Sequence, residues 1–237
     1  MNLLVNTKYR TEETEIMDDF SIKGDLLRDT LDKLASINKW LGGNKVTING
    51  LKKLIKDHPK SQPLTIVDLG CGGGDILRDV AKLGKREGYI FNLIGIDANE
   101  DAILYAKELS KDYDNISFSH CDIFSEEFKT LKYDIILTTL FLHHFKEEEL
   151  INFLSVVLKK TSLGIVVNDL HRHKLAYYLF KLLCVTIKNR MVIEDGLISV
   201  LRGFKRTELQ YISKQLKGNY QIKWKWAFRY QWIIRKN

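Results

Sequence analysis

Acidic residues and glycines gather at one point of the chain in a pattern that could bind a ligand. The segment TIVDLGCGGGD, residues 65–75, has four glycines between a run typical of a buried strand and a helical pattern. Glycine adopts positive φ without steric cost and lets the backbone approach a ligand closely. Asp68 and Asp75 flank the turn, which favours a ligand with positive charge over a phosphate. A tight strand-to-helix connection without any ligand is the alternative.

Two familiar phosphate-binding loops do not match this turn. A P-loop ends in Gly-Lys followed by Ser or Thr, and no such ending is present. A dinucleotide-binding GxGxxG loop would need glycine at position 75, where the chain has an aspartate. S-adenosylmethionine carries a sulfonium, an ammonium and a ribose, so it suits an acidic turn of this kind.

The same turn resembles the first motif of the class I S-adenosylmethionine-dependent methyltransferases. That motif is D/E-x-G-x-G-x-G, here Asp68-Leu-Gly70-Cys-Gly72-Gly-Gly74. The segments LIGIDAN (93–99) and HCDIF (120–124) resemble the second and third motifs. YDIILTTLFLHHF (133–145) resembles the fourth strand and the loop after it. The resemblance covers about residues 64–169 and the closing strand pair, with its motifs in the family's order.

This resemblance implies how the cofactor would be held. Asp97 would bind the ribose, since a carboxylate accepts two vicinal hydroxyl groups well. Asp122 would accept from the adenine amino group while Ile123 packs on the ring. One acid at a strand end is commonly a surface residue, whereas three in order are hard to explain by chance. The implied cofactor-binding residues are Asp68, Gly70, Cys71, Gly72, Gly74, Asp97, Ala98, Asp122, Ile123 and Thr139; S-adenosylhomocysteine would be the product.

Three histidines are candidates for acid–base chemistry. Methyl transfer requires a nucleophile aligned with the donor and water kept out, and a general base helps when the nucleophile is a hydroxyl. His143 and His144 follow the fourth predicted strand, and His171 follows the fifth. We favour His144. The alternative is that these histidines pack or cap a helix.

Substrate-binding residues are expected at the end of the fifth predicted strand. Asp169 and Arg172 lie there. Tyr177 follows in a predicted helical segment that contains leucines, aromatic residues and lysines. Arg172 could bind a carboxylate or phenolate, and Tyr177 could also be simple core. The His171-x-His173 pair lacks nearby carboxylate or thiol ligands, so we predict no metal.

These residues require an ordered sheet to bring them together. Hydrophobic, β-branched runs alternate with helical patterns after residue 63, which is typical of a parallel sheet covered on both faces. The last two strand-like runs, 220–226 and 228–234, are too close for a helix between them and should pair antiparallel. Helices are predicted over 24–41 and 46–56, and Glu194-Asp195-Gly196 predicts a turn.

The predicted fold class is therefore α/β: a Rossmann-like, seven-stranded, mostly parallel sheet with an antiparallel last strand. We divide the chain into an N-terminal helical extension (1–62), a cofactor-binding core (63–170), a helical cap between strands five and six (171–217) and a terminal strand pair (218–237).

Charge and composition limit the surroundings and partners. From residue 171 onward there are 15 Lys/Arg and three Asp/Glu, which makes this third strongly basic within a total net charge of +7. That surface could face nucleic acid or anionic lipid, or could simply be solvated. Three widely spaced cysteines predict no disulfide. No apolar run approaches the roughly 20 residues of a membrane span, and no secretion signal is recognised, so we expect a cytoplasmic protein.

The whole pattern resembles small-molecule methyltransferases of the ubiquinone/menaquinone type. The N-terminal EIMDD and LASINKWLGG segments are similar to bacterial members that act on phenolic or polyketide-like metabolites. This implies methylation of O or C on a small aromatic, quinone-like or polyketide-like acceptor. The alternative is an RNA methyltransferase that uses the basic C-terminal third. The Asn-Pro-Pro-Tyr or Asp-Pro-Pro-Tyr signature of amino-directed enzymes is absent, which disfavours nucleic acid. Peripheral membrane contact and the oligomeric state stay open.

Overall fold

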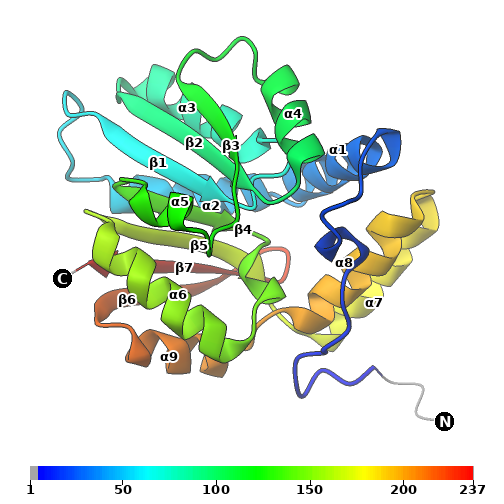
Figure 1. Ribbon diagram of the computed structural model, residues 1–237. Coiled ribbons are helices and arrows are strands. Elements are labelled where there is room, and N and C mark those ends of the chain that lie inside the picture. The colour runs from blue at the N-terminus through cyan, green and yellow to red at the C-terminus, as the bar shows by residue number, and fades with distance from the viewer. Residues whose placement is uncertain (1–4, 237) are drawn as a thin grey trace.

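A computed structural model describes residues 5–236. Its centre is a seven-stranded sheet of order β3-β2-β1-β4-β5-β7-β6 (Figure 1). Strands β1 to β5 are parallel, and β7 runs antiparallel to both of its neighbours. The strands are β1 Leu64–Leu69, β2 Phe91–Asp97, β3 Ile116–His120, β4 Ile135–Thr139, β5 Gly164–Leu170, β6 Gly218–Lys225 and β7 Arg229–Lys236. This order confirms the predicted fold class.

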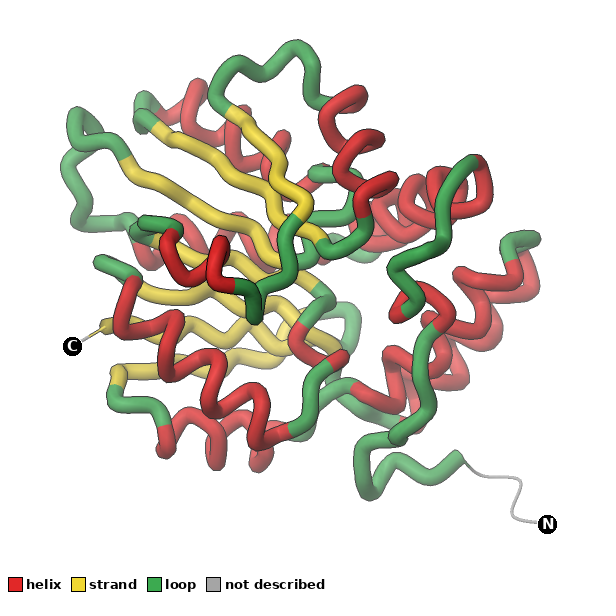
Figure 2. Tube along the Cα trace, in the orientation of Figure 1, coloured by secondary structure: helices red, strands yellow, loops and turns green. Residues whose placement is uncertain are grey.

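Helices cover both faces of the sheet (Figure 2). Alternate strand residues point to opposite faces: Ile135 packs in a cluster with α2 (Gly43–Leu54) and α3 (Asp75–Glu87). Its neighbour Ile136 packs in a second cluster, with α6 (Glu147–Lys160) and α9 (Arg206–Gln215). Burial on two faces is why these strands are nearly continuous apolar runs in the sequence. The short α5 (Glu126–Thr130) was not predicted; Ser125 caps it by accepting from the Phe128 amide at 3.2 Å.

The register of the parallel strands brings their carboxyl ends to one edge. Asp68 of β1 lies opposite Gly95 of β2, and Asp97 at the end of β2 lies opposite His120 of β3. A Cβ on Gly95 would lie 2.5 Å from the Phe118 ring and 2.9 Å from the Cys71 sulfur, so this strand position needs glycine. The sheet thus collects the predicted ligand-binding acids at the same end.

The N-terminal extension begins across that end of the sheet, and its last helix, α2, packs on one face. It contains a strap (residues 5–23) with the 3-10 turn η1 (Ile16–Asp18), then α1 (Asp25–Trp40) and α2. The predicted helix over 24–41 is confirmed by α1, whereas α2 begins at Gly43, three residues before the predicted start. Leu27 and Leu31 of α1 are buried against α4 (Glu100–Leu109).

The segment after β5 begins with α7 (Lys174–Leu183), η3 (Cys184–Thr186) and α8 (Arg190–Arg202). The predicted turn at 194–196 is wrong, because α8 runs through it. Asp195 accepts hydrogen bonds from the backbone amides of Ile16 (2.6 Å) and Met17 (3.0 Å), and Gly196 lies against the Phe180 ring. Helix α9 packs on α6 and β6, so within this segment the helices that cover the sheet end are α7 and α8. None of the described helices is long and apolar enough to span a membrane.

Candidate active site

A cavity of about 900 Å³ opens at the carboxyl ends of the central strands. Its walls come from the loops after β1, β2, β3 and β4, from α1, α7 and α8, and from the strap around η1. Most of the lining is apolar. Its polar groups include those at the glycine turn after β1 and those around the loop after β4.

The glycine turn after β1 presents backbone without side chains. Gly70, Gly72 and Gly74 have φ of +64°, +48° and +74°, a region that other residues adopt only with strain. A Cβ on Gly70 would lie 2.3 Å from the Phe141 ring, and one on Gly72 would lie 3.1 Å from Leu31. The turn is therefore packed closely on both sides and leaves its backbone open only toward the cavity.

The carboxylates of Asp97 and Asp68 lie beside this turn and differ in their hydrogen bonding. Asp97 accepts from the Gly72 amide (2.9 Å) and the Asn99 amide (3.0 Å), and burial raises its pKa. Asp68 is buried, and its Oδ1 has no hydrogen-bond partner among the described residues. Burial, and then the charges of Asp75 and Asp97, raise the pKa of Asp68 well above its usual value. A buried, unpaired acceptor beside two other acids calls for a cation or a donor from a ligand.

S-adenosylmethionine meets that requirement. Its positive groups match the unpaired Asp68 oxygen, and its ribose matches the Asp97 carboxylate at the neighbouring strand end. Asp122 is exposed, and its Oδ1 accepts from the Phe124 amide at 2.9 Å, while the buried Ile123 lines the cavity beside it. These residues fit the cofactor that the sequence predicted.

The loop after β4 turns sharply to reach the cavity. Leu140 has φ +55°, a conformation that costs a residue with a Cβ roughly 1–2 kcal/mol, and its amide donates to Asn168 at 2.9 Å. The turn places Phe141 against Gly70 and starts η2 (Leu142–His144). Backbone strain of this sort is common where a loop must aim functional side chains.

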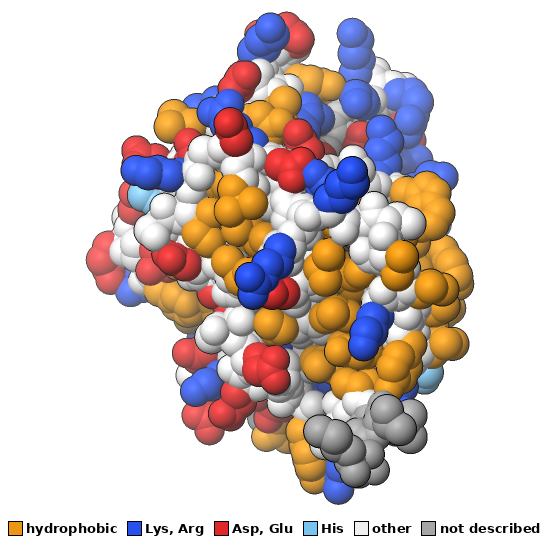
Figure 3. Space-filling view, turned by 90° about the vertical axis from the view of Figure 1, so that its right-hand side faces the viewer, with side chains coloured by type: hydrophobic (Ala, Val, Ile, Leu, Met, Phe, Trp, Pro, Cys, Tyr) orange, Lys and Arg blue, Asp and Glu red, His pale blue; other side chains and the backbone are white. Residues whose placement is uncertain are grey.

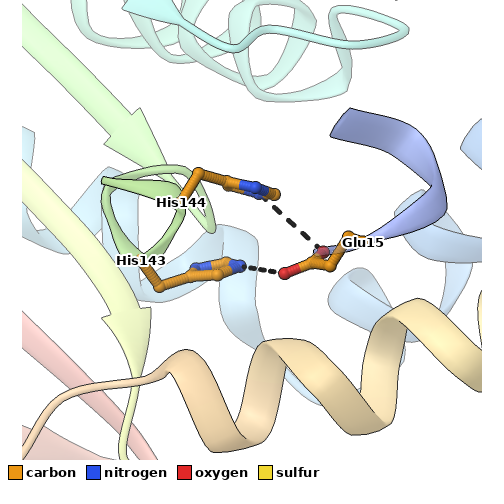
Figure 4. A group of neighbouring side chains, drawn as sticks. All are labelled: Glu15, His143 and His144. Carbon is orange, nitrogen blue, oxygen red and sulfur yellow. Dashed lines mark ion pairs between the residues drawn. The ribbon is translucent and has the colours of Figure 1, made fainter. Parts of the chain in front are cut away.

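His143 is buried between the carboxylates of Asp169 and Glu15, and Figure 4 shows its contact with Glu15. Its Nδ1 lies 2.7 Å from Asp169 Oδ1, and its Nε2 lies 3.4 Å from Glu15 Oε1. Burial opposes protonation, but Asp169 and Glu15 outweigh it and raise the pKa of His143 to about 9. His143 therefore carries a proton on each nitrogen at neutral pH.

His144 is partly exposed to the cavity and paired with a different acid. Its Nδ1 lies 2.7 Å from Asp18 Oδ1, and its Nε2 lies 3.9 Å from Glu15 Oε2. Arg202 donates to Asp18 Oδ2 at 2.6 Å and to the His144 carbonyl at 2.6 Å. Burial alone would raise the pKa of Asp18. The hydrogen bonds from His144 and Arg202 outweigh burial and hold that pKa well below its usual value. The strap acids, η2 and α8 thus form one charged network.

Comparison with known proteins decides the family. A model described as a methyltransferase domain matches residues 60–220, which is more than half of the chain. The chain belongs to the methyltransferase domain family. This confirms the predictions of an S-adenosylmethionine-dependent methyltransferase and of its cofactor.

Solved structures share the fold over most of their length. The plantazolicin methyltransferase BpumL in complex with SAH aligns with a TM-score of 0.65 and 20% identity, covering 90% of this chain and 92% of that one. Human N-acetylserotonin methyltransferase in complex with SAM aligns with a TM-score of 0.66 and 17% identity, covering 96% of this chain and 60% of that one.

Curated relatives match over shorter stretches. The protein-lysine N-methyltransferase EFM4 of Saccharomyces cerevisiae is 36% identical over 80 residues, which are 32% of this chain and 33% of the relative. The putative methyltransferase 235L of Invertebrate iridescent virus 6 is 39% identical over 74 residues, 31% of this chain and 25% of the relative. The matches span about a quarter to a third of these relatives.

Most of the predicted cofactor residues line the cavity of this methyltransferase. The lining includes Asp68, Gly70, Cys71, Gly72, Asp97, Ala98, Asp122, Ile123 and Thr139. Gly74 does not line it; a Cβ there would lie 2.7 Å from the Phe118 ring, so this glycine shapes the start of α3. Thr139 is also tied to α2, since its hydroxyl lies 2.8 Å from that of Thr47.

Three predicted substrate residues of the methyltransferase lie outside the cavity lining. Asp169 is buried, with its oxygens taken by the ring and amide of His143. Arg172 is fully buried and pairs with Glu208 of α9 and the Gly203 carbonyl. Tyr177 packs edge-on against Tyr178. We correct their assignment: Asp169 positions His143, and Arg172 joins β5 to α9.

His171 lines the cavity, unlike those three. Its Nδ1 accepts from the Trp224 indole at 3.2 Å. Burial, and then the neighbouring charges of His173 and Lys205, lower its pKa to about 4. At neutral pH it is an uncharged residue of the cavity rim and a weak base.

Sequence analysis assigned no role to Glu15, Asp18 or Arg202, although all three line the cavity. The local signals were the resemblance of the EIMDD segment to bacterial methyltransferases and the pair of acids three residues apart at 15 and 18. Glu15, His143 and His144 also bring three potential metal-ligand atoms within 4.8 Å of one another. Arg202 already places a cation 3.7 Å from Glu15 Oε1. The absence of a metal stays a prediction.

Proposed function

We propose that this methyltransferase moves a methyl group to an oxygen or carbon of a small aromatic, quinone-like or polyketide-like acceptor. The observation that supports it is a largely apolar cavity containing both the acidic glycine turn and a histidine–carboxylate pair. Solved structures with this fold include enzymes named for plantazolicin, N-acetylserotonin and magnesium protoporphyrin IX. These names describe the acceptors of those enzymes and do not identify the acceptor of this protein.

The chain would hold the cofactor through the strand ends. Asp68 would meet its positive end, Asp97 the ribose hydroxyls and Asp122 the adenine, with Ile123 against the ring. When bound, S-adenosylmethionine supplies a methyl group already activated by its sulfonium. The protein's remaining tasks are therefore to orient the acceptor, exclude water and remove a proton where the nucleophile is a hydroxyl or an acidic C–H.

His144 is the side chain best suited to remove that proton. Its Nδ1–H donates to Asp18, which fixes the tautomer that leaves Nε2 free to accept. His143 is less suited, because with a pKa of about 9 it is protonated at neutral pH. His143 would instead hold Glu15 in place.

Water exclusion would come from the strap and α8. Arg202 joins the strap to the β4 loop through Asp18 and the His144 carbonyl, and Asp195 joins it to α8. Aromatic rings such as Phe141, Phe145 and Phe180 line the cavity and would pack against a flat acceptor. Trp232 of the basic third is fully buried, whereas Trp224 and Trp226 are exposed. The largely apolar lining of the cavity favours a small acceptor over RNA.

The test is to incubate the protein with methyl-labelled S-adenosylmethionine and cell extract, and to follow the label by mass spectrometry. We expect it in a small organic molecule. Label that appears only in RNA or protein would overturn the acceptor class. Asp18→Asn and His144→Gln should each lower kcat while S-adenosylhomocysteine affinity in calorimetry is kept; unchanged kcat would remove His144 as the base.

A further inference from the structure

Exposed apolar side chains ring the mouth of the cavity. Trp40 at the end of α1, Leu182 in α7 and Trp226 between β6 and β7 are 75%, 68% and 64% exposed, and all three line the cavity. They come from three elements far apart in the sequence. Figure 3 shows an extensive hydrophobic surface on this side of the molecule, with Lys and Arg side chains around and within it.

Helix α7 extends this apolar surface. Leu175, Leu179 and Leu182 recur at the spacing of one helical face, and all are exposed. Ala176 is the only residue of α7 that is buried. Val185 just beyond the helix is 82% exposed. An amphipathic helix normally turns its leucines toward the core, so an outward leucine face marks an interaction surface.

Charge indicates what this surface meets. A lysine directly precedes each of the three mouth residues, at positions 39, 181 and 225, and none of these lysines forms an ion pair among the described residues. The segments that carry them, 33–56, 170–193 and 209–237, contain no Asp or Glu at all. Lysines interleaved with exposed leucine and tryptophan are typical of a protein surface that binds an anionic membrane: the apolar side chains insert into the interface and the lysines meet the lipid headgroups.

A second copy of the chain fits this surface less well. A symmetric dimer would place the same basic segments against each other, and like charges across an interface are repulsive. An anionic bilayer complements both the lysines and the apolar tips. The cavity opens among those tips, so an amphiphilic molecule could pass between bilayer and cavity without crossing water.

We propose that the face formed by Trp40, α7, Val185 and Trp226 docks on an anionic lipid surface, and that the acceptor is an amphiphile drawn from that surface. The identity of the acceptor class rests on the proposed function; the docking does not.

Vesicle co-sedimentation of the full chain tests the docking. We expect binding to phosphatidylcholine vesicles that contain phosphatidylserine, weakening as salt rises, and little binding to phosphatidylcholine alone. Leu175→Asp with Val185→Asp should lower binding at least tenfold, because both residues lie on this face and neither lines the cavity. Lys181→Glu should also lower it and reduce its salt dependence.

Leu104→Asp is the matched control. Leu104 lies in α4, is 53% exposed and does not line the cavity, so its change should leave vesicle binding intact. Equal loss in this control, or no binding to either vesicle, would overturn the proposal. So would a dimer in solution that Val185→Asp dissociates, since the face would then belong to a second copy.

Calorimetric S-adenosylhomocysteine binding should be the same in all these variants. That measurement separates the two proposals, because a failure of docking leaves cofactor binding unchanged. Conversely, loss of cofactor binding with docking retained would count against the proposed function alone. Circular dichroism confirms that each variant is folded.

Discussion

The Asp169 carboxylate holds His143 at two points: Oδ1 accepts from the ring Nδ1 at 2.7 Å, and Oδ2 accepts from the backbone amide at 3.2 Å. Asp169 is the penultimate residue of β5 and His143 lies in the loop after β4, so this pair fixes the loop to the neighbouring strand. The same carboxylate supplies the charge that keeps the imidazole protonated.

Asp169→Asn should therefore lower the pKa of His143 from its value of about 9, because the asparagine keeps the shape but loses the charge. NMR titration of the histidine ring protons measures this. Glu126→Gln, on the exposed α5, is the control and should leave the titration unchanged. A His143 that still titrates near 9 in Asp169→Asn would contradict the assignment.

The free energy of unfolding should fall as pH rises from about 6.5 through about 9. The pKa of His143 is raised in the folded state. Protonated His143 therefore contributes its full stabilisation at pH values below its pKa in the unfolded chain, and this stabilisation is lost at pH values above its pKa in the folded protein. The whole effect is on the order of 3 kcal/mol. Urea unfolding at several pH values measures it, and His143→Gln should flatten the dependence. An equally steep fall in that variant would assign the effect to another group.

Asp68→Asn should stabilise the protein without cofactor while weakening cofactor binding at least about tenfold. The pKa of Asp68 is raised on folding, so its contribution to stability is lost as pH rises from the unfolded value through the folded one. Asparagine does not ionise, so the variant does not lose this stability at neutral pH. Thermal unfolding should give a higher Tm, and calorimetry a weaker binding of S-adenosylmethionine. A lower Tm with unchanged affinity would contradict both parts.

Gly70→Ala should destabilise the fold by about 1–3 kcal/mol and weaken cofactor binding, because its Cβ would overlap the Phe141 ring at positive φ. Gly88→Ala is the matched control: its φ is +78°, but a Cβ there meets nothing within 4 Å. The control carries the backbone strain alone, at about 1–2 kcal/mol. Denaturant unfolding measures the free energy of unfolding of the two variants, and calorimetry measures their cofactor affinity. Equal effects in both variants would show that the overlap with Phe141 does not cause the loss.

Asp195→Ala should release the strap, because Asp195 accepts the amides of Ile16 and Met17. We expect faster tryptic cleavage at Arg10 or Lys23 and a higher KM for the acceptor, with the core intact. Glu194→Ala is the control, since Glu194 pairs on the surface with Arg190. Equal cleavage rates in the two variants would show that the strap is held by other contacts.

The cofactor half of the cavity was predictable because its signals are local. The glycine turn needs residues that tolerate positive φ. Asp97 ends β2, whose apolar run is visible in the sequence, and Asp122 comes two residues after β3. Parallel strands with helical crossovers then bring those ends together. Each step depends on neighbouring residues or on a general rule of topology.

The acceptor half depended on contacts that leave no local trace. Asp18 and Arg202 meet although they are 184 residues apart. Arg172, expected to face a substrate, is neutralised by Glu208. Asp195-Gly196 has the composition of a turn, yet it is helical because the glycine accommodates Phe180 and the aspartate serves the strap. In each case a distant partner overrides the local preference.

The placement of η1 also has a consequence for folding during synthesis. Residues 16–18 are synthesised before Asp195 and Arg202, the residues that hold them in place. While the intervening residues are being made, this stretch therefore stays undocked. The wall that η1 forms can close the cavity only after α8 has been synthesised.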